Sequence, residues 1–368
     1  MKFTIQTSEL NQALQNTLSV IEKKNTVPIL SNFLLRVSDQ QLFVISTNLE
    51  VGMKISCEIQ NSSSGEVTVP AKYFSDIIKD ISEKEVCVSR KDNHWIEVTS
   101  GKYKVNIVGL PGEDYPALPS FEGREYFLVR SESMKRMIDK TSFAVSNDST
   151  RYHLNGVFFE PLENSIFRMT ATDGHRLSIV DEEVFLKSPQ LKRGVIIPRK
   201  GLQELRKILD TSEEQIEMSL DRQYIFCKSK AISLLIRLID GEYPDYRQVI
   251  PKTFENKVQV DQSILFSAIR RVSHLANEKS RAIRFLIQRG VIQISSSNPE
   301  MGDAKEEVEA EYLGPEMDIA FNSKYLMDYL AVSDCSKIEL FVKDRMSPGI
   351  LQGEGRKNQT YVIMPMRI

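Results

Sequence analysis

The densest group of chemically capable side chains lies in residues 172–176, Thr-Asp-Gly-His-Arg, where an acid, a base and a cation share one turn of chain. In a hydrolase or transferase, His175 would act as a general base oriented by Asp173. The same residue types also suit a tight turn, in which Asp173 accepts backbone hydrogen bonds and Gly174 takes a positive φ. A catalytic stretch would stand alone in the chain, whereas a turn would recur wherever the fold repeats.

Similar stretches do recur, at residues 47–50 (Thr-Asn-Leu-Glu) and 297–300 (Ser-Asn-Pro-Glu), each beginning 125 residues from the central stretch. Both follow a short apolar run, and both lack the histidine and the arginine. The recurrence favours the turn over catalysis, so we expect no catalytic residue. His175, Arg176 and Leu177 still indicate a site peculiar to the central copy.

Equal spacing over the whole chain predicts three structural repeats. Junctions between strand-like and helical stretches recur at nearly the same period, at residues 69–73, 197–201 and 321–325. Two of the repeats end in linkers rich in proline, glycine and acids, at residues 109–119 and 240–251. We predict three domains, at residues 1–125, 126–252 and 253–368.

Each repeat has the same predicted order: a strand, an amphipathic helix, several strands, a second helix and further strands. The helices carry apolar residues on one face. In the first helix of the third repeat these are Ile264, Ala268, Ile269 and Val272. Such one-sided helices among many strands predict an α+β fold with two helices per domain lying on antiparallel sheets.

The polar faces of the helices carry more cations than acids, among them Arg136, Lys140, Arg199 and Lys200. Since the chain has a formal net charge of −2, its acids must gather elsewhere, as at residues 306–309. A local basic surface would attract a polyanion to one face. A single solvated helix often carries such cations for solubility alone. Their recurrence over several helices favours nucleic acid as the partner.

Signatures of other functions are missing from the sequence. It has no Walker-type phosphate loop, no Gly-x-Gly-x-x-Gly and no metal-spaced histidine pair, so we expect neither a cofactor nor a metal. The four cysteines are far apart, which indicates a reducing cytoplasm and neither a disulfide scaffold nor a zinc site. Without a signal pattern or an apolar run near the ~18 residues of a membrane span, we expect a cytoplasmic protein without membrane contact.

The last eight residues, 361–368 (Tyr-Val-Ile-Met-Pro-Met-Arg-Ile), are apolar, although chain ends are usually polar. The β-branched residues followed by proline predict a final edge strand, and the methionines suit an irregular apolar surface. We expect this tail to form one wall of a groove.

Motifs from one end of the chain to the other resemble those of the bacterial DNA polymerase III beta subunit family, the replicative sliding clamps. They are Met-Lys-Phe-Thr at 1–4, Pro-Ile-Leu at 28–30, Ala-Thr-Asp-Gly-His-Arg-Leu at 171–177, Pro-Arg-Lys-Gly at 198–201, Pro-Asp-Tyr-Arg at 244–247, Phe-Asn at 321–322 and Met-Pro-Met-Arg at 364–367. The resemblance implies a non-catalytic processivity factor of DNA replication, built from three domains of the DNA-clamp type.

The resemblance further implies that two chains close head to tail into a ring around double-stranded DNA. Contacts to phosphates would be independent of base sequence. The matching DNA-binding positions are Lys24, Tyr152, His153, Arg199 and Lys200.

The resemblance also implies a groove between the central and third domains. This groove would bind short apolar peptides of DNA polymerases, the clamp loader and repair proteins. Its matching positions are Leu154, Thr172, Gly174, His175, Arg176, Leu177, Pro244, Val249, Asn322, Tyr325, Met346, Val362, Met364, Pro365, Met366 and Arg367. Two departures bear on peptide preference: Gln248 stands where an arginine is common in the family, and Ser280 where a large aromatic residue is found.

For the homodimer, the resemblance implies that a first-domain edge strand with Val105 and Ile107 pairs with third-domain residues Leu275, Glu306 and Glu307. Exposed apolar strand edges have to be covered, and Lys72 or Lys102 would face the acids. An alternative of another class is a monomeric β-rich module that binds a protein or a glycan. The native mass separates the two.

Overall fold

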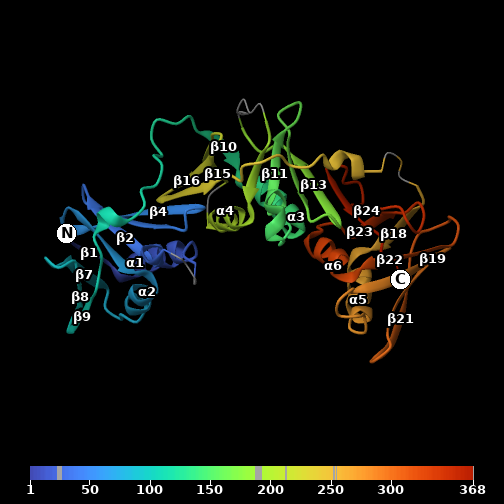
Figure 1. Cartoon of the computed structure of the whole chain (residues 1–368), viewed down its shortest axis with the longest axis horizontal. Helices are drawn as coiled ribbons and strands as arrows, with labels where there is room; N and C mark the ends of the chain where they lie inside the picture. The colour runs from blue at the N-terminus through green and yellow to red at the C-terminus, as the bar shows by residue number, and fades with distance from the viewer. Residues whose placement is uncertain (23–26, 187–192, 212–213, 252, 254, 368) are drawn as a thin grey trace. The chain divides into compact units, whose positions relative to one another are not determined.

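The structure is a computed structural model that describes residues 1–22, 27–186, 193–211, 214–251, 253 and 255–367. It divides into two compact units. Figure 1 labels helices and strands of both. Unit 1 contains Met1–Glu132, Phe185–Pro189 and Lys200–Leu238, and unit 2 contains Ser133–Val184, Gln190–Arg199 and Ile239–Ile368. The central repeat therefore contributes residues to both units.

The order of elements predicted for each repeat is confirmed. The first repeat contains β1 (Lys2–Gln6), α1 (Thr7–Leu18), β2 (Asn32–Ser38), β3 (Gln41–Thr47), β4 (Val51–Glu58), β5 (Gln60–Ser63), β6 (Gly65–Pro70), α2 (Ala71–Lys79), β7 (Glu85–Arg90), β8 (Ile96–Ser100) and β9 (Tyr103–Ile107). The second contains β10 (Phe127–Arg130), α3 (Ser131–Thr141), β11 (Gly156–Pro161), β12 (Phe167–Thr172), β13 (Arg176–Glu182), β14 (Val195–Pro198), α4 (Arg199–Thr211), β15 (Gln215–Leu220), β16 (Tyr224–Ser229) and β17 (Ile232–Arg237). The third contains β18 (Lys257–Asp261), α5 (Gln262–Ser273), β19 (Ala282–Gln288), β20 (Val291–Asn298), β21 (Gly302–Glu309), β22 (Met317–Asn322), α6 (Ser323–Val332), β23 (Lys337–Phe341), β24 (Gly349–Gly353) and β25 (Gln359–Ile363).

The strands form antiparallel sheets, as expected for this α+β fold. Unit 1 holds a five-stranded sheet, β5-β1-β7-β8-β9, and an eight-stranded one, β10-β15-β16-β17-β4-β3-β2-β6. Unit 2 holds an eight-stranded sheet, β14-β11-β12-β13-β25-β24-β23-β18, and a four-stranded one, β21-β20-β19-β22. Each large sheet joins two repeats, through the pair β17–β4 in unit 1 and the pair β13–β25 in unit 2.

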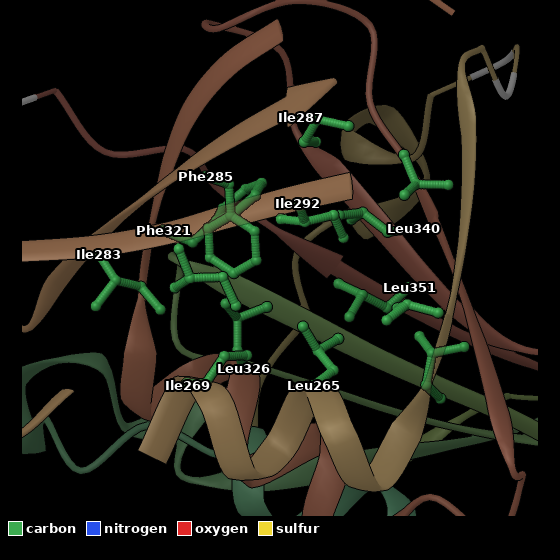
Figure 2. Packing of buried hydrophobic residues seen from close by; sticks show 14 of the residues in the cluster. Leu265, Ile269, Ile283, Phe285, Ile287, Ile292, Phe321, Leu326, Leu340 and Leu351 are labelled. Atoms are coloured by element: carbon green, nitrogen blue, oxygen red, sulfur yellow. The ribbon is translucent and has the colours of Figure 1, made fainter. Parts of the chain in front are cut away.

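Helix α5 shows how an apolar stripe creates the core. Its Leu265 and Ile269 point toward Phe285 and Phe321 of the neighbouring sheet (Figure 2). Each buried leucine side chain stabilises the fold by about 1.5–3 kcal/mol. The predicted stripe was wrong at Ile264, which is 52% exposed. Because the buried positions follow the spacing i, i+3, i+4, i+7 from Leu265, Ile264 falls outside that face.

The predicted final edge strand is also wrong. Strand β25 lies inside the sheet, where Ile363 is the register partner of Arg176 on β13 and of Gly349 on β24. The end of a chain need not be the edge of a sheet, because a strand from another repeat can occupy the free side. Pro365 follows the last paired residue, so its missing N–H removes no ladder hydrogen bond.

Candidate functional site

The stretch at residues 172–176 is a turn between β12 and β13. Oδ1 of Asp173 accepts hydrogen bonds from the backbone N–H groups of His175 (3.0 Å) and Arg176 (3.1 Å), and Gly174 has φ +90°. Oδ2 of Asp173 accepts a hydrogen bond from Nε of Arg176 at 3.0 Å. The carboxylate that would orient a general base is thus bound to the backbone and to an arginine, which supports the turn interpretation.

The corresponding stretch of the first repeat has the same two hydrogen bonds, and that of the third repeat keeps one of them. Oδ1 of Asn48 accepts from the N–H groups of Glu50 (3.1 Å) and Val51 (2.7 Å), and Leu49 has φ +73°. Oδ1 of Asn298 accepts from the N–H of Glu300 at 3.1 Å. The prediction of a turn shared by all three repeats is confirmed.

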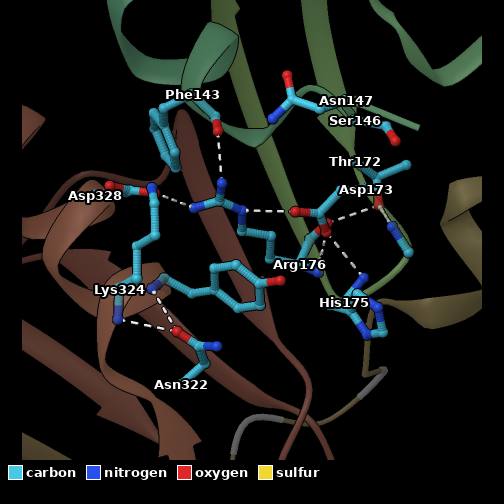
Figure 3. A network of polar contacts seen from close by, with 12 residues as sticks. Phe143, Ser146, Asn147, Thr172, Asp173, His175, Arg176, Asn322, Lys324 and Asp328 are labelled. Carbon is cyan, nitrogen blue, oxygen red and sulfur yellow. Dashed lines mark hydrogen bonds and ion pairs between the residues drawn. The ribbon is translucent and has the colours of Figure 1, made fainter. Parts of the chain in front are cut away.

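Arg176 joins the central turn to helix α6 (Figure 3). Its side chain is 6% exposed. Nη1 donates to Asp328 at 2.6 Å and Nη2 donates to the Phe143 carbonyl at 2.6 Å, while the guanidinium lies 4.4 Å from the centre of the Tyr325 ring. Burial alone would lower the pKa of Arg176, but Tyr361, Asp328 and Asp173 outweigh that effect and raise the pKa. The buried side chain therefore stays charged.

A buried apolar layer lies beside this turn. Leu177 of β13 and Val362 of β25 are register partners and pack with Tyr246. The Tyr243 hydroxyl accepts a hydrogen bond from the Thr172 N–H at 3.0 Å. Tyr243 was not predicted from the sequence, and Tyr246 appeared only within the motif at residues 244–247. A signal was available, because Tyr-Pro occurs at residues 115–116 as well as 243–244, and the Tyr115 hydroxyl accepts in the same way from the N–H of Thr47.

The tail follows this layer and is held by its backbone. The N–H of Met364 donates to the His175 carbonyl (2.9 Å), and the N–H of Met366 donates to the Ala320 carbonyl (2.8 Å). Two pockets adjoin the tail. Pocket A has a volume of about 440 Å³ and is lined by Gln248, Val249, Ile250, Pro251, Thr253, Glu255, Phe341, Val342, Lys343, Ser347, Pro348, Ile350 and Met364. Pocket B has a volume of about 360 Å³ and is lined by Arg284, Asp318, Ile319, Ala320, Arg345, Met346, Met366 and Arg367.

The predicted groove residues fall into several groups within unit 2. Some line the pockets: Val249 and Met364 in pocket A, and Met346, Met366 and Arg367 in pocket B. The turn contains Thr172, Gly174, His175 and Arg176. Asn322 caps the N-terminus of α6, whose first turn contains Tyr325. The His175 and Tyr325 rings lie 6.4 Å apart, so these two groups meet.

The remaining predicted groove residues are more dispersed. Leu154 is buried in the 3-10 helix Ser149–Leu154. Pro244 is exposed in the loop after β17, and Pro365 lies between the two anchored methionines. Of the two departures from the family pattern, Gln248 lines pocket A, while the Ser280 carbonyl accepts a hydrogen bond from Asn322 at 3.1 Å.

The first repeat has a similar turn, but its linker covers the adjoining surface. A Cβ at Gly52, the position that corresponds to Leu177, would lie 2.6 Å from a methyl carbon of Leu118. Phe121 is 7% exposed and packs edge-on against Phe226 at 5.3 Å. In the sequence, Val249 lies as many residues after Tyr243 as Phe121 lies after Tyr115. Val249 is nevertheless 38% exposed. The surface is thus filled in unit 1 and open in unit 2.

The predicted DNA-binding residues have different surroundings. Lys24 lies outside the described residues. Tyr152 is 56% exposed, and its ring lies 5.6 Å from that of His153. Arg199 begins α4 and donates from Nη1 to the Asn147 side chain at 2.5 Å.

Lys200 has a structural contact that was not predicted. Its ammonium donates to the Ser19 carbonyl at 2.6 Å and lies 3.0 Å from Glu204, whose side chain is 1% exposed. Burial alone would raise the pKa of Glu204, but hydrogen bonds from Ser19, Lys200 and Lys207 outweigh it and hold the pKa below its ordinary value. Lys200 therefore supports the packing of α4 against the end of α1.

The prediction that Lys140 lies on a solvent-exposed face of α3 is wrong, because Lys140 is 8% exposed. Its ammonium donates to Asp334 at 2.8 Å, because a buried cation requires a partner. Arg136 is partly exposed and makes two hydrogen bonds to Glu182, at 3.1 and 3.2 Å. Lys140 is thus buried against another repeat, whereas the Arg136 side chain remains 42% exposed while it binds Glu182.

The strands predicted to form the dimer contact are sheet edges. Among the described residues, β9 pairs only with β8 and β21 pairs only with β20. Val105 and Ile107 are half-buried on β9. On the other edge, Glu306 is bound by Arg271 at 2.9 Å, Glu307 is exposed, and Leu275 is half-buried just after α5.

No helix in the described part of the chain is long and apolar enough to cross a membrane. Within the same residues, no group of three or more histidine, cysteine, aspartate or glutamate side chains is arranged to hold a metal ion.

Comparison with known proteins gives the family. Sequence models of the DNA polymerase III beta subunit match with their N-terminal domain at residues 1–119, central domain at 128–245 and C-terminal domain at 247–367. The beta sliding clamps of Pseudomonas putida and Escherichia coli are 34% and 32% identical to this chain, with all of both chains covered. The crystal structure of a Pseudomonas aeruginosa DNA polymerase sliding clamp with ligand has a TM-score of 0.94 at 33% identity, again over both entire chains; one bound to griselimycin has a TM-score of 0.93 at 33% identity, with the same coverage. The resemblance is confirmed in preference to a hydrolase or transferase, and the chain belongs to the DNA polymerase III beta subunit family, the beta sliding clamps.

Proposed function

We propose that two copies of this chain close head to tail into a ring that encircles duplex DNA and keeps a DNA polymerase on its template during replication. The observation that carries the proposal is the match of three clamp domains over the whole chain. We propose residues 1–125, 126–252 and 253–368 as the three domains that each chain contributes to the ring, and we propose that the protein acts in the cytoplasm.

The dimer contact is proposed between β9 of one copy and β21 of the other. Both strands are sheet edges in the described residues, and an open edge exposes backbone donors and acceptors that a second strand can pair. Val105 and Ile107 would supply apolar contact near Leu275, while Lys72 or Lys102 would face Glu306 and Glu307.

A variant on β9 tests this contact. We expect the native protein to have a mass of about 84 kDa, twice the 42.1 kDa chain, and Ile107→Lys to yield monomers. Ile77→Lys, at a half-buried position on α2, is the matched control and should leave the dimer intact. A monomeric native protein would refute the ring.

DNA contact is proposed at Lys24, Tyr152, His153 and Arg199. An exposed aromatic ring and a guanidinium suit phosphate and sugar contacts that do not depend on base sequence. Arg136, Lys140 and Lys200 would act less directly, because their charged groups are paired with carboxylates, whereas Arg199 contacts a neutral amide.

The groove along the tail is proposed to bind short apolar peptides of DNA polymerases, the clamp loader and repair proteins. The buried layer of Leu177 and Val362 would form its floor, and methionines adapt to varied partners. A chain ending after Ile363 should keep its native mass as a dimer and lose binding of a polymerase-derived peptide. Retained peptide binding would overturn the assignment of the tail.

A further inference from the structure

Pocket B, at the Arg367 end of the tail, combines an apolar lining with three arginines and one acid. Nε and Nη2 of Arg284 donate to the two carboxylate oxygens of Asp318, at 2.7 and 2.8 Å. Nη2 of Arg345 reaches the same carboxylate only at 3.5 Å. Arg367 also lines the pocket and is exposed.

The charges in this pocket do not balance. Among the described residues that line it, one carboxylate accompanies three guanidinium groups, an excess of two positive charges. Asp318 is fully engaged by the planar fork of Arg284, whereas the side chain of Arg345 is 69% exposed. A guanidinium that is open on one side favours a carboxylate or phosphate, which it can bind through two parallel hydrogen bonds.

We propose that pocket B binds acidic side chains that directly flank the apolar core of a partner peptide, so that the groove selects partners with aspartate or glutamate at one end of that core. The proposal rests on the proposed peptide groove. Arg345 and Arg367 receive the acids, while Arg284 stays paired with Asp318.

A peptide explains the pocket better than a nucleic acid does. Ile319, Ala320, Met346 and Met366 line the same cavity as the arginines, and a phosphate backbone has no apolar group to place against them. The tail also leads from Met364 in pocket A to Met366 in pocket B. A single extended peptide along the tail would therefore reach both.

The test uses fluorescein-labelled peptides with the shared core Leu-Ala-Leu-Phe, titrated against the full chain. One peptide has Asp-Asp before the core, one has Asp-Asp after it, and the reference has Asn-Asn on both sides. Exposed ion pairs are weak, so we expect one acidic peptide to bind only roughly threefold to tenfold tighter than the reference. The advantage should shrink as salt screens the charges.

Two variants locate the effect. Arg345→Glu should abolish the acidic advantage, measured as the ratio of acidic to reference affinity within the same variant. Arg289→Glu alters the net charge equally at an exposed position outside the pocket and should preserve the advantage. Native circular dichroism checks that both variants fold.

The outcomes are distinct. If the reference peptide binds and neither acidic peptide binds tighter, the acid-binding pocket is refuted while the groove stands. If no peptide binds, both are refuted. If a ten-residue oligothymidylate binds in an Arg345-dependent manner and displaces the acidic peptide, pocket B is a phosphate site and the proposal is wrong.

Discussion

Replacing Arg176 by methionine removes the guanidinium that joins the central turn to α6 and keeps most of the side-chain stem. Asp173 and Asp328 would then lose their arginine contacts of 3.0 and 2.6 Å. Removing one partner of a buried ion pair costs about 3–5 kcal/mol. Because Asp328 keeps a 2.7 Å contact with Lys324, we expect a loss at or below the lower end of that range, roughly 2–3 kcal/mol of unfolding free energy.

Urea unfolding followed by circular dichroism measures this loss. Arg36→Met is the matched control, since the side chains of its ion pair with Glu66 are 50% and 32% exposed and such pairs contribute less than about 1 kcal/mol. Hydrogen exchange gives a local measurement. The amides of His175 and Arg176 donate to Asp173 and should exchange faster in the variant.

The peptide affinity of the variant should fall as well, because the turn that carries His175 also accepts the Met364 N–H of the tail. The reasoning would be refuted if Arg176→Met lost no more stability than Arg36→Met and left exchange at the turn unchanged. The turn would then be held by its backbone hydrogen bonds alone.

Three further predictions concern the contrast between the two units and the role of single charges. Phe121→Ala should lower the unfolding free energy by about 3 kcal/mol with little effect on peptide binding. Val249→Ala should change the unfolding free energy little and weaken peptide binding. Equal losses of unfolding free energy in urea would contradict the conclusion that this surface is filled in unit 1 and open in unit 2. The pKa of Glu204 is lowered in the fold, so its contribution to the unfolding free energy is present above the ordinary glutamate pKa and is lost as the pH falls through the lowered value. In urea titrations at a series of pH values, Glu204→Gln should therefore weaken the loss of unfolding free energy at acid pH. An unchanged pH dependence would argue against this role of Glu204. Lys140→Met should reduce thermal stability and weaken DNA binding much less than Arg199→Ser, which should leave thermal stability nearly unchanged. Fluorescence anisotropy titrations measure the DNA affinities, and an equal loss of DNA affinity in the two variants would place Lys140 in direct contact with DNA.

The sequence predicted features that repeat or that depend on local spacing. The 125-residue period located the three turns, and the helical period located helices α1–α6 of the described residues. The Asx-type hydrogen bonds of Asp173 and Asn48 follow from residue type and short range, so sequence neighbours were sufficient to predict them.

Features that depend on distant residues were missed. The partner of Arg176, Asp328, lies 152 residues away, and Lys140 is buried because Asp334 comes from another repeat. Strand β25 was placed at an edge because nothing in its own residues reveals that β13 pairs with its free side. Pairing between repeats is decided by packing, which a local pattern does not contain.

The central claim is that the protein stays on DNA by encircling it, and retention on circular compared with linear duplex tests this claim most directly. The clamp is loaded by its clamp loader with ATP, at a salt concentration that weakens direct phosphate contacts. We predict long retention on the intact circle and rapid loss once a nuclease cuts it. Equal retention on the circular and the cut DNA would contradict the topological mechanism.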